Sequence, residues 1–217
     1  CGINLLKDNK HDYKSLSHLV DYASDNGCNL IDTAPVYGDG ESEKVIGKVI
    51  EKKRSKVFLA TKVLLNSTDV LSIEKSCDKS LKRLRTDYID LFQIHWPNPE
   101  ININETMAVM EKLVKCGKIR YIGVSNFSEK EIQQSISYSS DYNLASIQSE
   151  YNLFERSIEK DILKLAIKEK ILVLAYSPLW QGKLANGVKQ LKILDYLSDK
   201  YSVTSTQIVL NYLANKK

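Results

Sequence analysis

Short runs of apolar, β-branched and aromatic residues recur along the chain at nearly constant intervals. The six runs cover residues 29–34, 57–63, 89–96, 119–126, 145–151 and 172–178. Their midpoints, taken at residues 31, 59, 92, 122, 148 and 174, are separated by 28, 33, 30, 26 and 26 residues. A step of about 30 residues is that of one strand and one helix, so we expect the two to alternate throughout.

The stretches between the runs carry the apolar spacing of helices. The clearest stripe consists of Val70, Ile73, Cys77, Leu81 and Leu84. Ser128 and Glu131 match a capping box at the start of a helix. Gly27, Gly117 and Lys170 stand where the helices before them are expected to end. Strands that are apolar on both faces, alternating with helices, indicate a parallel sheet covered by helices.

Two α/β architectures fit this alternation, an open doubly wound sheet and a closed barrel. Gly38, Gly40 and Gly47 follow the first run without the GxGxxG spacing of a dinucleotide-binding turn. The sequence therefore favours a (β/α)8 barrel of the TIM type, incomplete, with six clear strands and residues 1–6 as the candidate remnant of a first strand. We expect one domain over residues 1–217, since single α/β domains run to about 200 to 250 residues.

Charge and cysteine content exclude several classes of protein. The 31 Lys and Arg residues are interspersed with 27 Asp and Glu residues, so we expect no nucleic-acid partner. The basic runs 52–56 and 82–85 are interpreted as solvated helix ends. No stretch approaches the roughly 18 to 20 apolar residues of a membrane span. The 4 cysteines form no CxxC pair, which predicts reduced thiols and a cytoplasmic location.

Polar side chains close each apolar run, where a barrel enzyme carries its active site. Four titratable groups, Asp32, Tyr37, Lys62 and His95, come from three successive runs and the turn after the first of them. A phenol with a pKa of about 10 becomes a useful proton donor beside a cation, and Lys62 is the candidate cation. Asp32 would hold the lysine and His95 would bond a substrate oxygen, which suits carbonyl reduction.

Reduction also requires a hydride source, which the remaining strand ends suit. Asn126 and Gln148 offer amides for a carboxamide, and Tyr176 offers a ring to stack on a nicotinamide. No metal site is expected, because His95 is the only histidine near the predicted rim. His11 and His18 are interpreted as surface residues.

Six segments resemble the aldo-keto reductase superfamily, (β/α)8 barrels that reduce aldehydes and ketones with a nicotinamide dinucleotide, usually NADPH. The segments are IDTAPVYGDGESEKVIG (31–47), LATK (59–62), DYIDLFQIHWPNP (87–99), GKIRYIGVSNFS (117–128), IQSEYNLFER (147–156) and LAYSPLWQGKL (174–184). The resemblance implies Tyr37 as general acid, Lys62 as the cation that lowers its pKa, Asp32 as the partner of Lys62, and His95 as the group that orients the carbonyl.

The same resemblance implies a cofactor site and a substrate pocket. The implied nicotinamide contacts are the amide partners Ser125, Asn126 and Gln148 and the stacking residue Tyr176, with Ser177 and Leu179 near the pyrophosphate. Trp96 and Trp180 are candidate walls of the substrate pocket, and packing is an equal alternative for Trp180. The expected partner is a small carbonyl substrate and the expected cofactor NADPH, with NADH as the other candidate. The sequence carries no feature that sets an oligomeric state.

The sequence departs from the family pattern at both ends. At the N-terminal end, only residues 1–6 could be a remnant of the first strand. Residues 204–213 resemble the seventh helix of the barrel, and eight units of about 30 residues need about 240 to 250 residues, against 217 here. We expect the sequence to be the ordered part of a longer chain, rather than a truncated product or a barrel completed by another subunit.

The function expected from the sequence is therefore NAD(P)H-dependent reduction of aldehydes or ketones to alcohols. The alternative is a cofactor-binding regulatory or scaffold protein on the same fold, as potassium-channel β-subunits within the superfamily illustrate.

Overall fold

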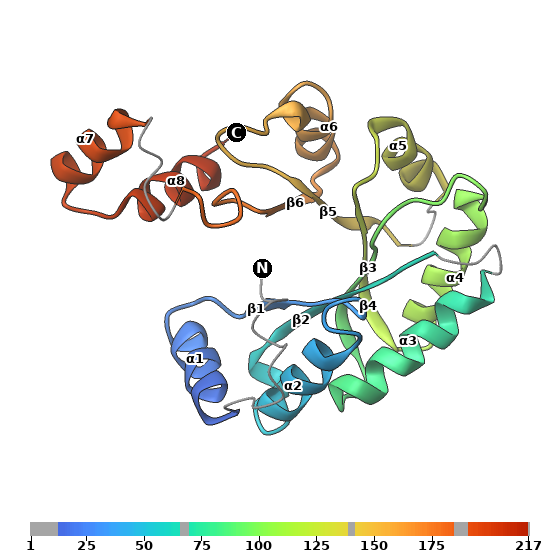
Figure 1. Cartoon of the computed structure of the whole chain (residues 1–217). Helices are drawn as coiled ribbons and strands as arrows, with labels where there is room; N and C mark the ends of the chain where they lie inside the picture. Colours follow the sequence, from blue (N-terminus) through green and yellow to red (C-terminus); the bar gives the residue numbers. More distant parts are fainter. Residues whose placement is uncertain (1–12, 66–69, 139–141, 185–190, 217) are drawn as a thin grey trace. The chain divides into compact units, whose positions relative to one another are not determined.

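The computed structural model describes residues 13–65, 70–138, 142–184 and 191–216, and in these residues helices and strands alternate up to the last two helices, which follow one another (Figure 1). The strands are β1 Leu30–Asp32, β2 Phe58–Val63, β3 Ile89–Ile94, β4 Ile119–Ser125, β5 Leu144–Glu150 and β6 Leu172–Tyr176. The helices are α1 Tyr13–Asp25, α2 Glu41–Ile50, α3 Leu71–Leu84, α4 Ile103–Lys115, α5 Glu129–Tyr138, α6 Ile162–Glu169, α7 Lys192–Tyr201 and α8 Ser205–Ala214, with short 3-10 turns Arg54–Lys56 and Ser157–Glu159. Each predicted apolar run overlaps one strand, which confirms the βα period.

The strands within the described ranges follow one another in the sheet in the order β1-β2-β3-β4-β5-β6. The pairs β1–β2, β2–β3, β3–β4 and β5–β6 are parallel, as predicted. One register matters for the site, because Lys62 of β2 is opposite Gln93 of β3. The candidate first-strand remnant at residues 1–6 lies outside the described residues, as does His11.

The chain divides into two compact units, of which one ends at Ala145 and the other begins at Ser146. The first contains α1 to α5 and β1 to β4, and the second contains α6, β6, α7, α8 and most of β5. The expectation of one domain over residues 1–217 stays a prediction.

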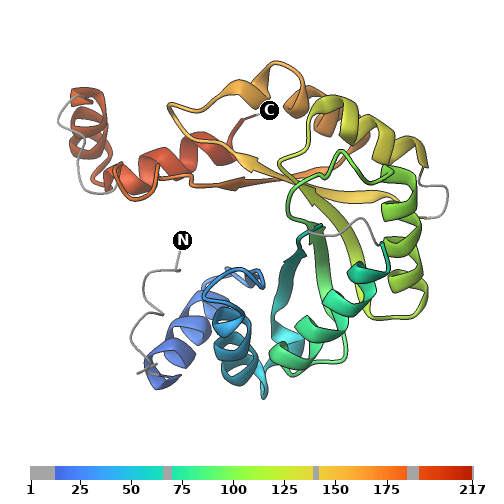
Figure 2. The same ribbon diagram turned by 45° about the vertical axis from the view of Figure 1, so that its right-hand side comes forward.

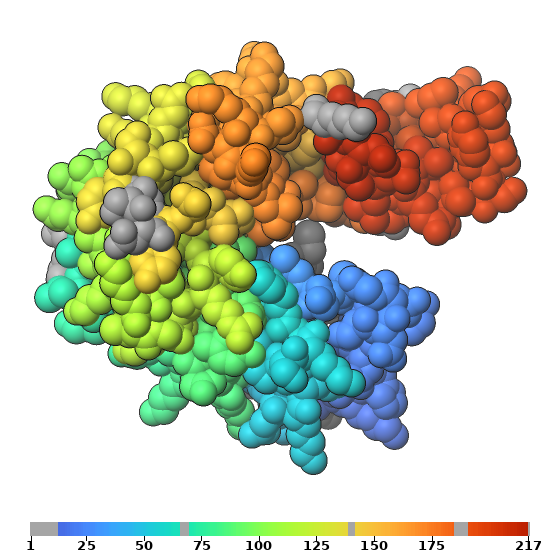
Figure 3. All heavy atoms as spheres, turned by 180° about the vertical axis from the view of Figure 1, so that it is seen from behind, coloured from blue at the N-terminus to red at the C-terminus, as the bar shows by residue number. Residues whose placement is uncertain are grey.

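The core of the first unit lies between its strands and its helices. Figures 1 and 2 show α2, α3 and α4 along one side of strands β1 to β4. Every residue of β3 is buried, as expected for a parallel strand covered on both faces. From the stripe predicted for α3, Ile73, Cys77 and Leu84 are fully buried. In the space-filling view, successive segments of this unit follow one another from blue to yellow-green (Figure 3).

Helices α2 and α3 approach each other closely at Gly47. A Cβ atom on this glycine would lie 2.6 Å from the carbonyl carbon of Leu84, which is too close for any side chain. The spacing of the two helices therefore depends on a residue without a side chain, and it brings the helices that follow β1 and β2 together.

Several predicted helix ends are confirmed. Gly27, Gly117 and Lys170 adopt left-handed backbone conformations, with φ of 82°, 73° and 57°. Arg85 and Ser202, which end α3 and α7, do the same with φ of 54° and 53°. The backbone N–H of Ser128 donates to the Glu131 carboxylate, and the N–H of Glu131 donates to Ser128 Oγ, which forms the predicted capping box.

The interpretation of both basic runs as solvated is wrong for one arginine in each. Only 13% of the Arg54 side chain and 23% of the Arg83 side chain are exposed. Arg54 Nη2 donates to Oδ2 of the buried Asp90 at 2.7 Å, and Arg120 Nη1 donates to Oδ1 at 2.7 Å. A guanidinium is buried readily when it is paired with a carboxylate, and the composition of a short run does not reveal such a partner.

The second unit has a small core of its own. Leu184, Leu194 and Val209 are buried together, and Leu179 and Trp180 pack against them. Helix α8 begins at a capping box between Thr204 and Gln207, in agreement with the helix expected at residues 204–213. Across the described ranges, no helix has both the length and the apolar character needed to cross a bilayer.

Candidate active site

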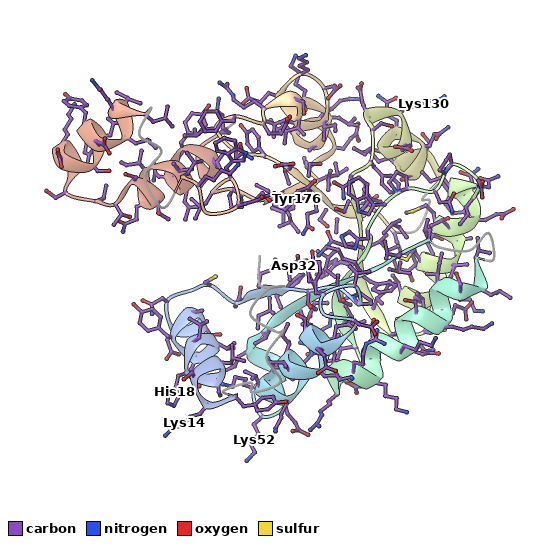
Figure 4. The ribbon with its side chains drawn as sticks, viewed as in Figure 1. Lys14, His18, Asp32, Lys52, Lys130 and Tyr176 are labelled. Carbon is purple, nitrogen blue, oxygen red and sulfur yellow. The ribbon has the colours of Figure 1, made fainter. Side chains whose placement is uncertain are left out.

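The turn after β1 carries the predicted proton donor. Asp32 is the last residue of β1 (Figure 4), and Tyr37 lies in the loop that leads to α2. The Tyr37 N–H donates to the Ala34 carbonyl at 3.0 Å, and the Tyr37 carbonyl accepts from the Ser42 N–H at 3.2 Å. The Tyr37 backbone is therefore held at one end within the loop and at the other by the first turn of α2.

Lys62 forms the predicted ion pair from the neighbouring strand. Its side chain is completely buried, and its Nζ donates to Asp32 Oδ2 at 2.6 Å and to the Thr33 carbonyl at 3.0 Å. Burial lowers the pKa of Lys62, because a charge loses hydration there, and the attraction and hydrogen bond of Asp32 oppose that change. Asp32 is thus the group that favours the charged form of this buried lysine.

His95 lies beside Tyr37 at the end of β3. The two rings meet edge to face, with centres 6.0 Å apart and planes at 84°, and Lys62 Nζ lies 5.2 Å from the centre of the Tyr37 ring. Burial, and secondarily the charge of Lys62, lowers the pKa of His95 from 6.5 to about 4 although Asp32 opposes the shift. At neutral pH the imidazole is therefore uncharged. Its Nδ1 is buried and has no hydrogen-bond partner within the described ranges.

Asn126, one of the residues predicted to contact the cofactor, directly follows β4. Asn126 Nδ2 donates to the His95 carbonyl at 2.9 Å and to Ser125 Oγ at 3.0 Å. Asn126 also has φ of 62°, a conformation that asparagine tolerates better than most residues. Ser125 is buried, and Trp96 next to His95 is 52% exposed. The first unit therefore brings together Asp32, Tyr37, Lys62, His95, Ser125 and Asn126.

The other predicted residues belong to the second unit. Gln148 is buried in β5, Tyr176 ends β6, and Ser177 follows with φ of 50°. The Tyr176 carbonyl accepts from the Tyr151 N–H at 3.3 Å. Burial, and then the charges of Glu150 and Glu155, raises the pKa of Tyr176, so this phenol stays protonated.

Leu179 and Trp180 are held by packing within the second unit. Both contact the core of that unit, and the Trp180 ring lies 4.6 Å from the ring of Phe154, centre to centre. The ammonium group of Lys183 lies 4.2 Å from the centre of the Trp180 ring. Trp180 therefore packs within the second unit, and its contact with a substrate stays a prediction.

A model of the aldo/keto reductase family matches residues 2–217 of this sequence. The chain belongs to this family.

Two relatives of known sequence illustrate the likeness. The chain is 45% identical to aldo-keto reductase YhdN of Bacillus subtilis (strain 168) over 63% of its length, and 37% identical to methylglyoxal reductase YeaE of Escherichia coli (strain K12) over 86%. These alignments span 44% of YhdN and 66% of YeaE, so this chain covers less than two thirds of either protein.

A solved structure supports the same assignment. The crystal structure of an aldo/keto reductase from Klebsiella pneumoniae in complex with NADP and acetate matches 95% of this chain and 74% of its own, at a TM-score of 0.85 and 33% identity. This likeness, with the parallel strands in sequence order, confirms the predicted (β/α)8 fold class of the aldo/keto reductases.

Two polar residues of this aldo/keto reductase were not identified as site residues from the sequence. Gln93 is fully buried in β3, and its Nε2 donates to Asp32 Oδ1 at 3.3 Å, so both oxygens of Asp32 are bonded. In the second unit, buried Asn152 accepts the N–H groups of Phe154 and Glu155 at 2.9 Å and donates to the Ser177 carbonyl at 3.3 Å. The signal of Gln93 in the sequence is an amide between Phe92 and Ile94 in a predicted buried strand.

Proposed function

We propose that the protein is an NAD(P)H-dependent oxidoreductase that reduces small aldehydes or ketones to alcohols. The observation that carries this proposal is the buried Lys62 ammonium, 2.6 Å from Asp32 and 5.2 Å from the centre of the Tyr37 ring. Such a cation favours the phenolate that Tyr37 would become after giving up its proton. The membership of the aldo/keto reductase family supports the reaction class.

In the proposed reaction, the carbonyl carbon receives a hydride and the carbonyl oxygen receives the proton of Tyr37, which yields the alcohol. His95 donates a hydrogen bond to the same oxygen as a neutral imidazole, since its pKa is about 4. Asp32 keeps Lys62 charged, so that the tyrosinate is stabilised until it regains a proton from water.

The donor set of the described residues fits a nicotinamide. Ser125 and Asn126 place a hydroxyl and an amide at the end of β4, beside His95, and these groups match the donors and acceptor of a carboxamide. In the second unit, Gln148 would provide another amide, Tyr176 a ring for stacking, and Ser177 and Leu179 contacts near the pyrophosphate. A bound reduced nicotinamide supplies the hydride. The NADP complex of the Klebsiella pneumoniae relative supports NADPH as the cofactor of this protein, with NADH as the second candidate.

The first substrate to test is an α-oxoaldehyde. YeaE is named a methylglyoxal reductase, and it is 37% identical to this chain. Methylglyoxal reduction with NADPH or NADH is followed at 340 nm, and cofactor binding is followed by quenching of Trp96 and Trp180 fluorescence. We expect saturable binding and turnover, with NADPH preferred.

The variant Tyr37→Phe separates chemistry from binding. We expect it to lower the reduction rate by about a hundredfold or more, because the proton donor is gone, while cofactor affinity stays within about twofold. Tyr121→Phe is the matched control, since this exposed tyrosine lies in β4 and is expected to leave both unchanged. Unchanged reduction by Tyr37→Phe would disprove the mechanism, and binding without turnover in the wild type would favour the regulatory alternative.

A further inference from the structure

Glu43 is a completely buried carboxylate that the proposed reaction does not use. It lies on α2, and its Oε1 accepts a hydrogen bond from Thr61 Oγ1 at 2.7 Å. Its Oε2 accepts from Arg83 Nε on α3 at 2.6 Å. An unpaired buried carboxylate is strongly unfavourable, so Glu43 is held to both partners and ties α2, β2 and α3 together.

The bond to Thr61 reaches the strand of the buried lysine. Thr61 directly precedes Lys62 in β2, and successive side chains of a strand point to opposite faces. Glu43 therefore binds β2 from the side of its helices, through the residue that precedes Lys62.

Glu43 also lies close in sequence to the loop that carries Tyr37, the proposed proton donor. The loop from Thr33 to Gly40 carries Tyr37 and leads into α2, and a hydrogen bond of 2.8 Å joins the hydroxyls of Thr33 and Ser42, in the first turn of that helix. Glu43 is the next residue, so its bonds fix the start of the helix to which this loop is attached.

The side chain of Arg83 also packs against this loop. A Cβ atom on Gly40 would lie 2.8 Å from Arg83 Cδ, so the arginine stem packs directly against the loop backbone. Gly40 has φ of 84°, a second reason for glycine at this place. Arg83 therefore contacts both the loop and the carboxylate that anchors it.

We propose that Glu43, held by Arg83, is a positioning residue for carbonyl reduction, because it fastens the loop of Tyr37 to the strand of Lys62. The inference rests on the proposed function. Neither Glu43 nor Thr61 is expected to touch substrate or cofactor, so their effect is expected in the rate of the chemical step and not in substrate affinity.

The test compares two substitutions at one position. Thr61→Val keeps the shape of the side chain and removes the hydroxyl that bonds Glu43, whereas Thr61→Ser keeps the hydroxyl. We expect Thr61→Val to lower kcat by about tenfold to a hundredfold with KM for the carbonyl substrate changed less than about twofold. Thr61→Ser is expected to retain kcat within about threefold. Ile73→Val, in the core of α3, is the control for a general loss of stability.

Equal kcat values for Thr61→Val, Thr61→Ser and Ile73→Val would overturn the inference, as would a loss of kcat that follows unfolding free energy alone. A second readout does not depend on turnover. In protein labelled with 13C at tyrosine Cζ, the Tyr37 resonance is assigned by its loss in Tyr37→Phe. We expect Thr61→Val to shift it and Thr61→Ser to leave it in place. A wild type without reductase activity refutes the proposed function, whereas an unshifted Tyr37 resonance in Thr61→Val refutes the positioning role.

Discussion

The Nζ atom of Lys62 lies 2.6 Å from Oδ2 of Asp32, although the lysine side chain is completely buried and 29% of the aspartate side chain is exposed. The charge of Lys62 thus depends on a partner that stands at the boundary with solvent. The two members of this pair are therefore expected to respond differently to substitution.

Lys62→Met removes the buried charge and fills most of its space. Because burial opposes the charge of Lys62, and the Asp32 carboxylate left behind is partly exposed and can be hydrated, we expect unfolding free energy within about 1 kcal/mol of the wild type. Reduction is expected to fall by about a hundredfold or more, since the tyrosinate loses its cation. Urea unfolding and the rate at 340 nm measure the two effects, and a joint loss of folding and rate would contradict the separation.

Asp32→Asn leaves Lys62 buried without its carboxylate. The pKa of Lys62 is expected to fall further, because Asp32 is the group that raises it against burial. Lysine then loses its proton at a lower pH, so the alkaline decline of the reduction rate is expected to move to lower pH. We also expect a loss of about 2 kcal/mol of unfolding free energy, reduced from the value for a fully buried pair by the exposure of Asp32. A rate profile identical to that of the wild type would show that Asp32 does not control Lys62.

His95 makes the folded protein sensitive to acid. Its pKa is lowered from 6.5 to about 4, so between these values the unfolded chain binds a proton at this residue that the folded chain does not bind. Stability is therefore lost as the pH falls through this window. His95 is only partly buried, so with solvent screening we expect a loss of about 1 to 2 kcal/mol.

The measurement is urea unfolding of the wild type and His95→Gln at pH 7.5 and pH 4.5. We expect the variant to lose less unfolding free energy than the wild type between these two values. His18→Gln is the control, because His18 is exposed on α1 and points away from the unit in Figure 4. Parallel losses in the wild type and His95→Gln would refute the assignment.

Asn152 is expected to hold the turn at Phe154 and Glu155 and to connect it to Ser177. Asn152→Ala leaves two N–H groups and the Ser177 carbonyl without their present partner, which costs about 2 to 3 kcal/mol. We expect faster amide exchange at Phe154 and Glu155, and weaker NADPH binding if Ser177 contacts the cofactor as proposed. Asn143→Ala, at an exposed asparagine, serves as control. Unchanged exchange at both amides would contradict the expectation.

Substitution of Asp90 is expected to lower the stability of the protein without changing its reaction rate. It lies near the start of β3, and Asp90→Asn weakens bonds to Arg54, Arg120 and the Leu59 N–H. Because breaking a buried ion pair is strongly destabilising, we expect a loss of about 3 kcal/mol of unfolding free energy. The rate per folded molecule is expected to stay within about twofold, since active sites of this fold class lie at the carboxyl ends of strands. A tenfold loss of rate in fully folded protein would contradict this division.

The sequence was sufficient to predict the strands and to place Asp32, Lys62 and His95 at or beside the carboxyl ends of three of them, because both follow from short-range pattern. The catalytic roles of these residues and of Tyr37 stay predictions. Gln93 and Glu43 were not identified, because their roles depend on register and on helix packing. Lys62 is opposite Gln93 only in the observed pairing of β2 with β3, and Glu43 meets Arg83 across the contact of α2 with α3, where Gly47 lets the two helices approach.

The same limit applies to Arg54 and Arg83. Their runs are basic, and a charged run usually lies in water. Their partners Asp90 and Glu43 lie 36 and 40 residues away in the sequence, so no local pattern connects them. A buried ion pair between distant elements is thus the kind of feature that sequence spacing alone leaves undetermined.

Helices α3, α6 and α7 end at Arg85, Lys170 and Ser202, exposed residues in a backbone conformation that suits glycine. A non-glycine residue in this conformation is strained, so glycine at each position is expected to raise the free energy of unfolding by about 0.5 to 1 kcal/mol. This additional stability would be useful in protein engineering, because substitutions that change a binding pocket commonly weaken folding. Three surface changes would supply a starting scaffold that tolerates a broader mutant library.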